Sequence, residues 1–553
     1  MHKILAYCSA EFGLTTRLPT YSGGLGILAG DHAKAAADVG LPLVGVSLWY
    51  HQGYGIQRID ELGEQQLDFP RCRPQDVLQD TGVEIELELP GQTVFVHVWR
   101  YDVVGRGGHI VPVHFLDTMD ERNEPEWQDV SRMLYGGDHT NRLRQEVILG
   151  VGGFAAIRKL YPDAEVHAHL NEGHTAFFAA SMLLELGDLE RVRARCHFTT
   201  HTPVPAGHDV FEHADIVTIL GDKLPPEIAK LGGTERLSMS VLALALASTC
   251  NGVSELNAKI AMGMFPNRQI DGLTNGVHFD TWIHPHIGSV YDRHFSGWRD
   301  DPALLEGITT LNDAGFDAEF AEARGLAKRE LCEFVNASTS LGFDPDVLTI
   351  GFARRAAPYK RALLIFQDIE RLLALTGGKL QIVFAGKAHP NDVRGRQLVT
   401  SLVRTTRSLR GRLRVAFLPN YSMWHGRMLT AGSDIWLNTP VRPMEACGTS
   451  GMKASLNGVP NLSVLDGWWA EACDHGVNGW AMVEAHDDQD DVRDADALYT
   501  LLENEVLPAY YETPAHFEAI RRAAVATAPR FSARRMVLDY AHRYYGVGEP
   551  PAK

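Results

Sequence analysis

The stretch VLTIGFARRAAPYKR, residues 347–361, joins a short apolar run to a loop that carries four cations. Such a run, ending at once in a polar loop, is typical of a buried β-strand. Similar runs follow at intervals that are filled by helical patterns: LQIVFAG, RVAFLP, DIWLN and NLSVL. This alternation predicts a parallel sheet that is covered by helices on both faces.

The first half of the chain repeats the pattern. Its apolar runs are KILAYCSA, LVGVSLWY, AEVHAHLN and CHFTTHT, with helical stretches such as 31–39 and 142–160 between them. VEIELEL, TVFVHVWR and HIVPVHFL interrupt the alternation and predict an antiparallel meander. Because residues 275–343 are richer in Asp, Gly and Pro, we place a boundary near position 275. The chain is expected to form two doubly wound α/β domains, with ligands bound in a cleft beyond the carboxyl ends of the strands.

Composition excludes several classes of function. The 553 residues include 52 basic and 69 acidic side chains, a net charge of −17, which argues against general binding to nucleic acid or to an anionic membrane. No apolar run reaches the ~18 residues of a membrane helix. The N-terminus lacks the pattern of a signal peptide, and the seven cysteines form no C-x-x-C pair. We therefore expect a cytoplasmic protein with reduced thiols.

Three clusters lie where ligands are expected. Arg354, Arg355, Lys360 and Arg361 follow one strand and suit an anion, although a solvated basic helix start would look the same. In YSGGLGILAGD, Gly24-x-Gly26-x-x-Ala29 imitates a dinucleotide fingerprint without a strand running into it. The bare N–H groups of this segment suit an anion at a helix start.

The third cluster is HAHLNEGH, residues 167–174. Its histidines and Glu172 are compatible with a metal site that His201 and His208 would complete, but the spacing matches no helical zinc motif. The same groups suit hydrogen bonds to sugar hydroxyls, and we expect no metal. Trp468-Trp469 is compatible with a sugar-stacking patch or with a buried aromatic pair.

The segment EACGTSGMKASLNG, residues 445–458, combines a polar glycine turn with the start of a helix. Thr449 or Ser450 suits an N-cap, and the free N–H groups of such a turn suit an anion. Lys453 is the side chain that can form a Schiff base with an aldehyde. An anion and an aldehyde at one place suggest pyridoxal phosphate, although small-residue turns before helices are common.

The motifs YSGGLGILAGD, HLNEGHT, TTHTPVPAGH, LTNGV, ARRAAPYKR, PNYS and EACGTSGMKASLNG occur in the order found in α-glucan phosphorylases, which the chain resembles from Ala6 to about Glu471. It is most similar to the short bacterial and archaeal type. The resemblance implies the GT-B fold: a Rossmann-like N-terminal domain at 1–275 with a β-meander insertion, and a cofactor-binding domain at 276–524. A last helix, about 525–553, would pack back on the first domain.

The resemblance also implies roles for individual residues. Lys453 matches the lysine that holds pyridoxal 5′-phosphate; Thr449, Ser450, Gly451 and Arg354 match its phosphate site, and Tyr421 lines its pocket. Arg355 and Lys360 match the pair that grips the substrate phosphate, helped by Gly24. Glu445, Cys447 and Gly448 match the segment that reads the glucosyl hydroxyls, and Asn275 and His201 match groups near the same sugar, where Glu172 is also expected.

The implied activity is reversible phosphorolysis of α-1,4-glucan, such as glycogen, starch or maltodextrin. Phosphate would release the non-reducing-end glucose as α-glucose 1-phosphate with retention, and the cofactor phosphate would transfer the proton. A nucleotide-sugar glycosyltransferase of the same fold is the alternative, and a homodimer is compatible with the resemblance. The sequence departs from many relatives at Gly13, Cys447 and Ser450-Gly451, which puts one cofactor contact in doubt.

Overall fold

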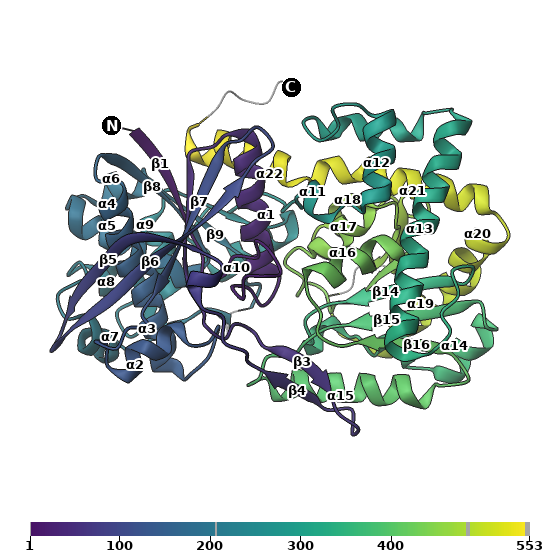
Figure 1. Cartoon of the computed structure of the whole chain (residues 1–553), viewed down its shortest axis with the longest axis horizontal. Helices are drawn as coiled ribbons and strands as arrows, with labels where there is room; N and C mark the ends of the chain where they lie inside the picture. The colour runs from purple at the N-terminus through teal and green to yellow at the C-terminus, as the bar shows by residue number, and fades with distance from the viewer. Residues whose placement is uncertain (1, 205–206, 483–486, 548–553) are drawn as a thin grey trace. The chain divides into compact units, whose positions relative to one another are not determined.

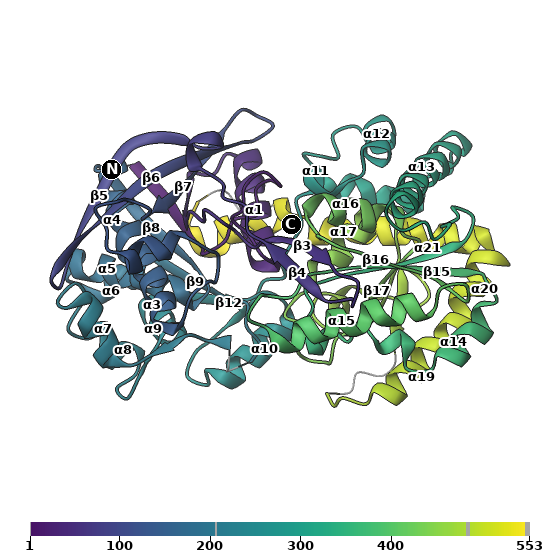
Figure 2. The ribbon, with the colours of Figure 1, turned by 60° about the horizontal axis from the view of Figure 1, so that its bottom comes forward.

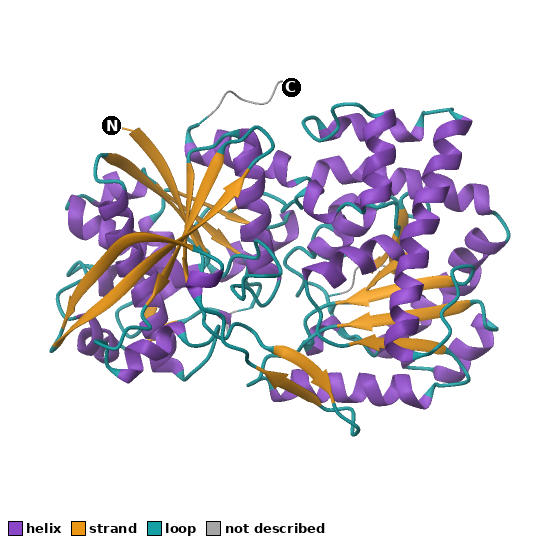
Figure 3. Ribbon diagram, in the orientation of Figure 1, coloured by secondary structure: helices purple, strands orange, loops and turns teal. Residues whose placement is uncertain are grey.

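A computed structural model of the chain describes residues 2–204, 207–482 and 487–547. Packing divides the chain into two compact units, each assembled from separate segments. The first comprises Met1–Gly55, Phe69–Thr274 and Ala533–Lys553, and the second comprises Ile56–Asp68 and Asn275–Ser532. Each unit has its own sheet with helices around it (Figure 3), so the predicted α/β class is confirmed.

The first unit is built on a nine-stranded sheet in the order β13-β12-β9-β8-β1-β2-β7-β6-β5. The seven strands from β13 to β7 are parallel, whereas β6 pairs antiparallel with both β7 and β5. The predicted meander is therefore correct, and it extends the parallel sheet at one edge. The strands are β1 (His2–Cys8), β2 (Leu43–Leu48), β5 (Gln79–Leu89), β6 (Gln92–Val104), β7 (Ile110–Asp117), β8 (Ala164–Asn171), β9 (Cys196–Thr200), β12 (Thr249–Gly252) and β13 (Asp271–Gly272).

Alternate residues of these strands face two separate cores. Ala6 of β1 packs into the core under α5 and α9, and its neighbour Tyr7 packs into the core under α1 and α22. This two-sided burial explains why the strands read as continuous apolar runs. The longer helices are α1 (Gly24–Val39), α3 (His139–Val147), α4 (Gly153–Leu160), α5 (Ala176–Leu186), α7 (His213–Leu220), α9 (Met239–Leu246), α10 (Glu255–Met264) and α22 (Ala533–Tyr540).

The second unit has a six-stranded sheet in which every pair is parallel, in the order β16-β15-β14-β17-β18-β19. This is the strand order of a doubly wound fold, and its switch point lies between β14 and β17. The five predicted strands are all present. The bounds are β14 (Leu348–Ala353), β15 (Leu380–Ala385), β16 (Arg414–Leu418), β17 (Ile435–Asn438), β18 (Asn461–Val464) and β19 (Gly479–Met482).

This second sheet is also covered on both faces (Figures 1 and 2). Phe384 of β15 faces the core that includes α14 and α19, and Val383 faces the core that includes α13, α16 and α17. The helices are α11 (Phe279–Trp282), α12 (Pro285–His294), α13 (Ala314–Thr339), α14 (Ile369–Thr376), α15 (Val393–Ser408), α16 (Met423–Gly432), α17 (Thr449–Leu456), α18 (Trp469–Ala472), α19 (Asp491–Leu501), α20 (Leu507–Tyr511) and α21 (Pro514–Thr527).

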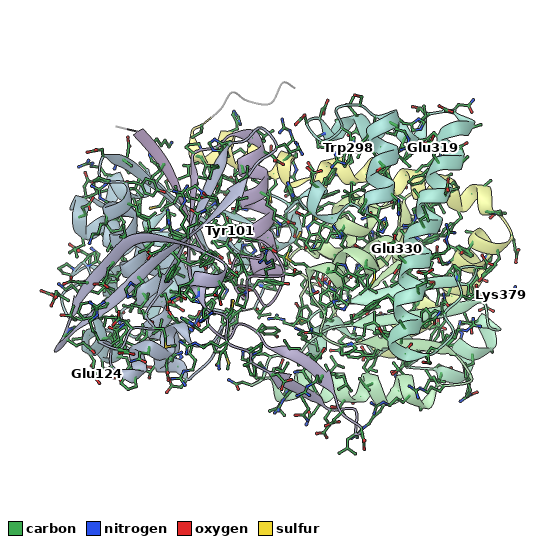
Figure 4. The ribbon with its side chains drawn as sticks, in the orientation of Figure 1. Tyr101, Glu124, Trp298, Glu319, Glu330 and Lys379 are labelled. Carbon is green, nitrogen blue, oxygen red and sulfur yellow. The ribbon has the colours of Figure 1, made fainter. Side chains whose placement is uncertain are left out.

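Helix α13 holds the short helices that precede it in the second unit. Two glutamates of this helix, Glu319 and Glu330, are labelled in Figure 4. Glu319 accepts a hydrogen bond from Arg293 Nε at 2.8 Å. Glu330 Oε2 lies 3.0 Å from His284 Nε2. The backbone N–H of His284 also donates to Asn457 at 2.8 Å. These contacts tie the α11–α12 segment to α13 and to the end of α17, and so fix Trp282 at the end of α11.

The division by packing differs from the sequence-based one at two places. A hairpin of β3 (Ile56–Ile59) and β4 (Gln65–Asp68), expected in the N-terminal domain, belongs to the second unit because its side chains hydrogen-bond to loops of that unit. Residues 525–532 of the expected last helix also belong to the second unit, and α22 of the first unit packs against α1. Among the described residues, no helix combines the length and apolarity that a bilayer crossing requires.

Candidate functional site

The second unit gathers charges at the carboxyl ends of β14 and β17, which are neighbours in the sheet. Arg354 Nη2 lies 2.6 Å from Glu445 Oε2, and Lys360 Nζ lies 2.5 Å from the same oxygen. The side chains of Arg354, Lys360 and Glu445 are 7%, 9% and 10% exposed, respectively. Two cations therefore share one buried carboxylate at the switch point of the sheet, where doubly wound folds bind their ligands.

The two cations decide the ionisation of this carboxylate. Burial would raise the pKa of Glu445, but Arg354 and Lys360 outweigh it and lower the pKa to about 2. The backbone N–H of Glu445 donates to Asp466 Oδ2 at 2.9 Å, just beyond β18. Burial, with a smaller contribution from Glu445, raises the pKa of Asp466 to about 7. The site thus places a carboxyl group whose pKa is lowered next to one whose pKa is raised.

The start of α17 differs in detail from the expected cap. Gly448, in the left-handed region with φ of 87°, is the N-cap residue, and the helix begins at Thr449. The expected N-cap role of Thr449 or Ser450 is therefore wrong; Ser450 Oγ instead accepts from Trp436 Nε1 at 3.1 Å. A Cβ on Gly451 would lie 2.4 Å from Asn461 Oδ1 and 2.8 Å from the Trp468 ring. The small residue is required because this turn packs directly on a buried tryptophan.

Lys453 lies one turn into α17 and is buried. Its Nζ stands 3.5 Å from the centroid of the Trp282 ring, an arrangement that stabilises a cation. Asn457 donates to the carbonyl of Lys453 at 2.8 Å and to that of Trp282 at 3.0 Å, so it fixes both residues. A Cβ on Gly426 would lie 3.1 Å from Tyr421 OH and 3.4 Å from the Trp282 ring, so Tyr421 lies close to the Trp282 ring.

The four cations that follow β14 have different surroundings. Arg354 and Lys360 are buried on Glu445, and Arg355 is exposed. Arg361 does not fit the expectation of an anion-binding cluster. Its guanidinium donates to the carbonyls of Thr439 and Pro440 at 2.9 Å each and pairs with Asp494 at 2.6 Å, so it fixes the loop after β17.

In the first unit, the carboxyl ends of β8 and β9 bring Glu172 and His201 together. Glu172 Oε2 accepts from the His201 N–H at 2.8 Å and from Thr202 Oγ1 at 3.0 Å. His201 Nε2 lies 2.7 Å from Asn171 Oδ1. Burial lowers the pKa of His201, and Glu172 opposes that shift. Glu172 has φ of 81°, a costly conformation for a non-glycine residue that is frequent at functional sites.

The glycine segment before α1 is held by an acid that the sequence analysis did not single out. Glu11, beyond the end of β1, accepts from Ser22 N at 2.6 Å and from Gly23 N at 3.3 Å. Gly24 is exposed, and a Cβ there would meet nothing within 4 Å. Gly13, by contrast, has no room: a Cβ would lie 2.9 Å from Ile27 Cδ1, so α1 fills the space that the glycine leaves.

The histidines of HAHLNEGH do not converge on one point. His169 Nδ1 lies 2.5 Å from Tyr545 OH, on the α22 side of the sheet. His174 Nε2 accepts from Ala10 N at 3.1 Å, and His167 lies beside Glu165. These partners do not support the metal alternative.

Trp468 and Trp469 are each 1% exposed, so they form the buried pair rather than a sugar-stacking patch.

The remaining expected site residues lie along the same segments. Cys447 is buried between Glu445 and α17, and its carbonyl accepts from Trp468 N at 2.9 Å. Asn275 is buried at the start of the second unit.

The sequence analysis missed Glu11, Trp282 and Asp466. Glu11 and Asp466 follow apolar strands directly, so the rule that located the other strand-end residues could have found them. For Trp282 we find no such signal.

The geometry of the second unit fits an anionic cofactor that bears an aldehyde. Among the residues that the structure describes, Arg354 Nη1 is buried without a hydrogen-bond partner, although Nη2 pairs with Glu445. A buried guanidinium N–H left in this state costs free energy that an anionic ligand would recover. The start of α17 adds a helix N-terminus, and Lys453 supplies an amine.

The strand order places the second unit among doubly wound α/β folds, and buried charged side chains gather at its switch point. Comparison with known proteins narrows this class. Residues 226–479 match the family described as carbohydrate phosphorylase. The chain is 39% identical to the maltodextrin phosphorylase of Thermococcus litoralis, over 98% of this chain and 70% of that protein.

Two further relatives give the same result. The chain is 38% identical to the glycogen phosphorylase of Mycobacterium tuberculosis, over 98% of this chain and 70% of that protein. It is 35% identical to the glycogen phosphorylase of Aquifex aeolicus, over 98% of this chain and 86% of that protein. The chain therefore belongs to the carbohydrate phosphorylase family.

Proposed function

We propose that this protein is an α-glucan phosphorylase with the GT-B arrangement of two Rossmann-like domains. It would transfer the non-reducing-end glucose of an α-1,4-glucan, such as glycogen, starch or maltodextrin, to inorganic phosphate, and would run the reaction in both directions. The product is α-glucose 1-phosphate with retained configuration. The observation that carries the proposal within this family is the buried cluster of Arg354, Lys360 and Glu445 at the switch point of the second unit.

Pyridoxal 5′-phosphate is the cofactor we propose for this site. Lys453 would hold it covalently, with Tyr421 and Trp282 beside it. Its phosphate would lie at Arg354 and at the turn formed by Thr449, Ser450 and Gly451. When bound, the cofactor supplies a phosphate group that can exchange a proton with the substrate phosphate. The orphaned Nη1 of Arg354 and the tight packing around Gly451 support this assignment.

The substrate phosphate is assigned to Arg355 and Lys360, with the backbone at Gly24. Both cations are needed because a substrate phosphate near a cofactor phosphate would otherwise be repelled strongly. Preorganised charges of this kind also stabilise the oxocarbenium-like transition state flanked by phosphate. Glucosyl hydroxyls are assigned to groups that donate or accept hydrogen bonds: Glu445, Cys447, Gly448, Asn275, Glu172 and His201.

The nucleotide-sugar glycosyltransferase is not favoured. Such an enzyme would bind a diphosphate and would need neither Lys453 nor a chromophore, whereas the relatives at 35–39% identity are phosphorylases. Under the same proposal, the partners are glucan and phosphate, the enzyme forms a homodimer, and nucleic acid and membranes are not partners. The net charge of −17 supports the last point.

Product analysis tests the activity directly. Purified protein should release glucose 1-phosphate from maltooligosaccharides only when phosphate is present. Release of unphosphorylated glucose at the same rate without phosphate would instead identify a hydrolase.

The cofactor is tested by absorption and by borohydride treatment. Reduction should attach pyridoxal phosphate permanently to Lys453, as seen by peptide mapping, and should leave substantial phosphorolysis, because only the cofactor phosphate takes part. Lys453→Ala should bind the cofactor poorly. A fully active wild-type protein without pyridoxal would overturn the assignment.

A further inference from the structure

The β3–β4 hairpin supplies two buried glutamines to the second unit. Gln57 is 2% exposed and Gln65 is 7% exposed, although their neighbours Arg58 and Gln66 point to solvent. Gln57 Nε2 donates to Gln65 Oε1 at 2.7 Å, which joins the two amides into one unit. A buried side-chain amide costs free energy unless its N–H groups and its oxygen form hydrogen bonds. The remaining hydrogen-bond partners of Gln57 and Gln65 therefore show which segments the two side chains hold.

The first group of partners is the loop that follows β15. Gln57 Nε2 donates to the carbonyl of Gly386 at 3.0 Å. Gln65 Nε2 donates to the carbonyl of Ala388 at 2.9 Å, and the Ala388 N–H donates back to Gln65 Oε1 at 2.9 Å. The two glutamines therefore replace a strand as the hydrogen-bonding partner of residues 386–388.

This loop in turn supports the basic loop after β14. Arg354 N donates to the Ala385 carbonyl at 3.1 Å, and Ala356 N donates to the Lys387 carbonyl at 2.9 Å. A Cβ on Gly386 would lie 2.1 Å from the Arg354 carbonyl, so the two backbones are in direct contact. A shift of residues 386–388 would consequently move Arg354 and Arg355.

The second group of partners is the turn before α16. Asn420 N donates to Gln57 Oε1 at 2.8 Å, and Gln57 N donates to Asn420 Oδ1 at 3.2 Å. Asn420 has φ of 60°, a left-handed conformation that these reciprocal bonds hold in place. The next residue in the chain is Tyr421, which lines the proposed cofactor pocket.

We propose that Gln57 and Gln65 are positioning residues, through which a hairpin from the N-terminal part of the chain fixes the phosphate-binding loop and Tyr421. Neither glutamine is among the residues assigned to the cofactor or the substrate. They act through the backbones of residues 386–388 and of Asn420, which lie at the carboxyl ends of β15 and β16. The role assigned to them in catalysis rests on the proposed function.

The hairpin itself is anchored independently of the glutamines, which allows a clean test. Arg404 of α15 donates to the carbonyl of Leu62 at 2.9 Å, and Arg407 donates to those of Glu61 and Asp60 at 2.6 and 2.9 Å. Substitution of one glutamine should therefore loosen the supported loops while the hairpin stays docked. Gln66 is the matched control on the same strand as Gln65. Its side chain is exposed and donates a hydrogen bond to Asp60 within the hairpin.

The experiment compares Gln57→Ala, Gln65→Ala and the isosteric Gln57→Glu with Gln66→Ala in the full-length protein. Gln57→Glu keeps an acceptor for Asn420 N but cannot donate to Gly386. Hydrogen exchange in peptides that cover 386–388 and 420–421 should accelerate in the first three variants and not in Gln66→Ala. This readout does not depend on activity or on a cofactor.

Kinetics and cofactor binding provide the second readout. The Gln57 and Gln65 variants should raise KM for phosphate and weaken pyridoxal phosphate retention by about ten- to hundred-fold, which is the effect of removing an outer supporting partner in metal sites. KM for maltooligosaccharide should not change. General destabilisation would instead reduce the active fraction, and so kcat, without this split.

Unchanged hydrogen exchange in 386–388 and 420–421 would overturn the positioning role, whatever the enzyme does. Altered exchange with an unchanged phosphate KM and normal cofactor retention would also overturn the proposal, since the loops would then be irrelevant to the site. If wild-type protein bound no pyridoxal phosphate and used no phosphate, the proposed function would fail, and the exchange data would still decide whether the hairpin positions the loops.

Discussion

Lys360 Nζ and Glu445 Oε2 lie 2.5 Å apart in the interior of the second unit, and Arg354 contacts the same oxygen at 2.6 Å. One carboxylate therefore pairs with two cations that are proposed to face phosphates, and one positive charge of the cluster stays uncompensated by it. A phosphate at the proposed site would add a second anion beside these cations. The cluster is thus suited to exchange an internal counter-ion for an external one.

Glu445→Gln should lower the free energy of unfolding by about 3–5 kcal/mol, because it leaves two buried cations without their charge partner. Inorganic phosphate should restore more stability to this variant than to wild type, since the anion replaces the lost charge. Urea unfolding with and without phosphate measures both effects. Glu370→Gln, at a carboxylate 79% exposed and paired with Arg412, is the control. Equal stabilisation of all three proteins by phosphate would contradict the prediction.

Arg355→Ala and Lys360→Ala should impair phosphate use far more than glucan binding. Removal of one charge that is aimed at the transition state typically costs about 2.7–4 kcal/mol, or ~10²–10³ in rate. Steady-state kinetics at varied phosphate and at varied maltooligosaccharide separate the two effects. Arg361→Ala provides a contrast, because that side chain holds the loop after β17 and should reduce stability first. A near wild-type rate at low phosphate in either site variant would remove that residue from the assignment.

The first unit should lose stability on acidification, because of buried histidines under α22. Burial lowers the pKa of His197 and of His32 to about 3 each. Between about pH 6.5 and 3 the unfolded chain binds protons at these positions and the folded chain does not. Unfolding free energy should therefore fall by about 1.4 kcal/mol per pH unit for each histidine.

Denaturant unfolding between pH 7 and pH 4 measures this slope. His197→Gln, which can still hydrogen-bond at the position of the ring, should show a shallower slope than wild type. His475→Gln, on a side chain 46% exposed, is the control. An identical slope in wild type and His197→Gln would show that this histidine is not a source of the acid sensitivity.

Gly451→Ala should disrupt the turn before Lys453, because the added Cβ would lie 2.4 Å from Asn461 Oδ1. Overpacking of this kind costs about 1–3 kcal/mol, and cofactor retention should fall with it. Gly263→Ala is the matched control: this glycine is in α10, and a Cβ there would meet nothing within 4 Å. That change should raise stability by about 0.5–1 kcal/mol. Thermal unfolding and cofactor titration of both variants provide the comparison, and a neutral Gly451→Ala would show that the turn can relax.

The sequence by itself located most strands of the two sheets and the strand ends at which ligands are expected. Strands buried on both faces read as continuous apolar runs, so β14 to β18 could be located from hydrophobicity alone. Because side chains at the carboxyl ends of parallel strands share one edge, Arg354, Glu172 and His201 could be singled out before any coordinates were known.

Only the tertiary structure decided how these side chains are used. Composition and spacing alone do not distinguish Lys360 from Arg361, yet the first lies on Glu445 and the second fixes the loop after β17. Likewise, nothing local in the hairpin 56–68 shows that Gln57 reaches Gly386, 329 positions along the chain. A local sequence pattern indicates which backbone groups pair within a helix or a strand. The partner of a buried polar side chain depends instead on which distant segment the fold brings within hydrogen-bonding distance.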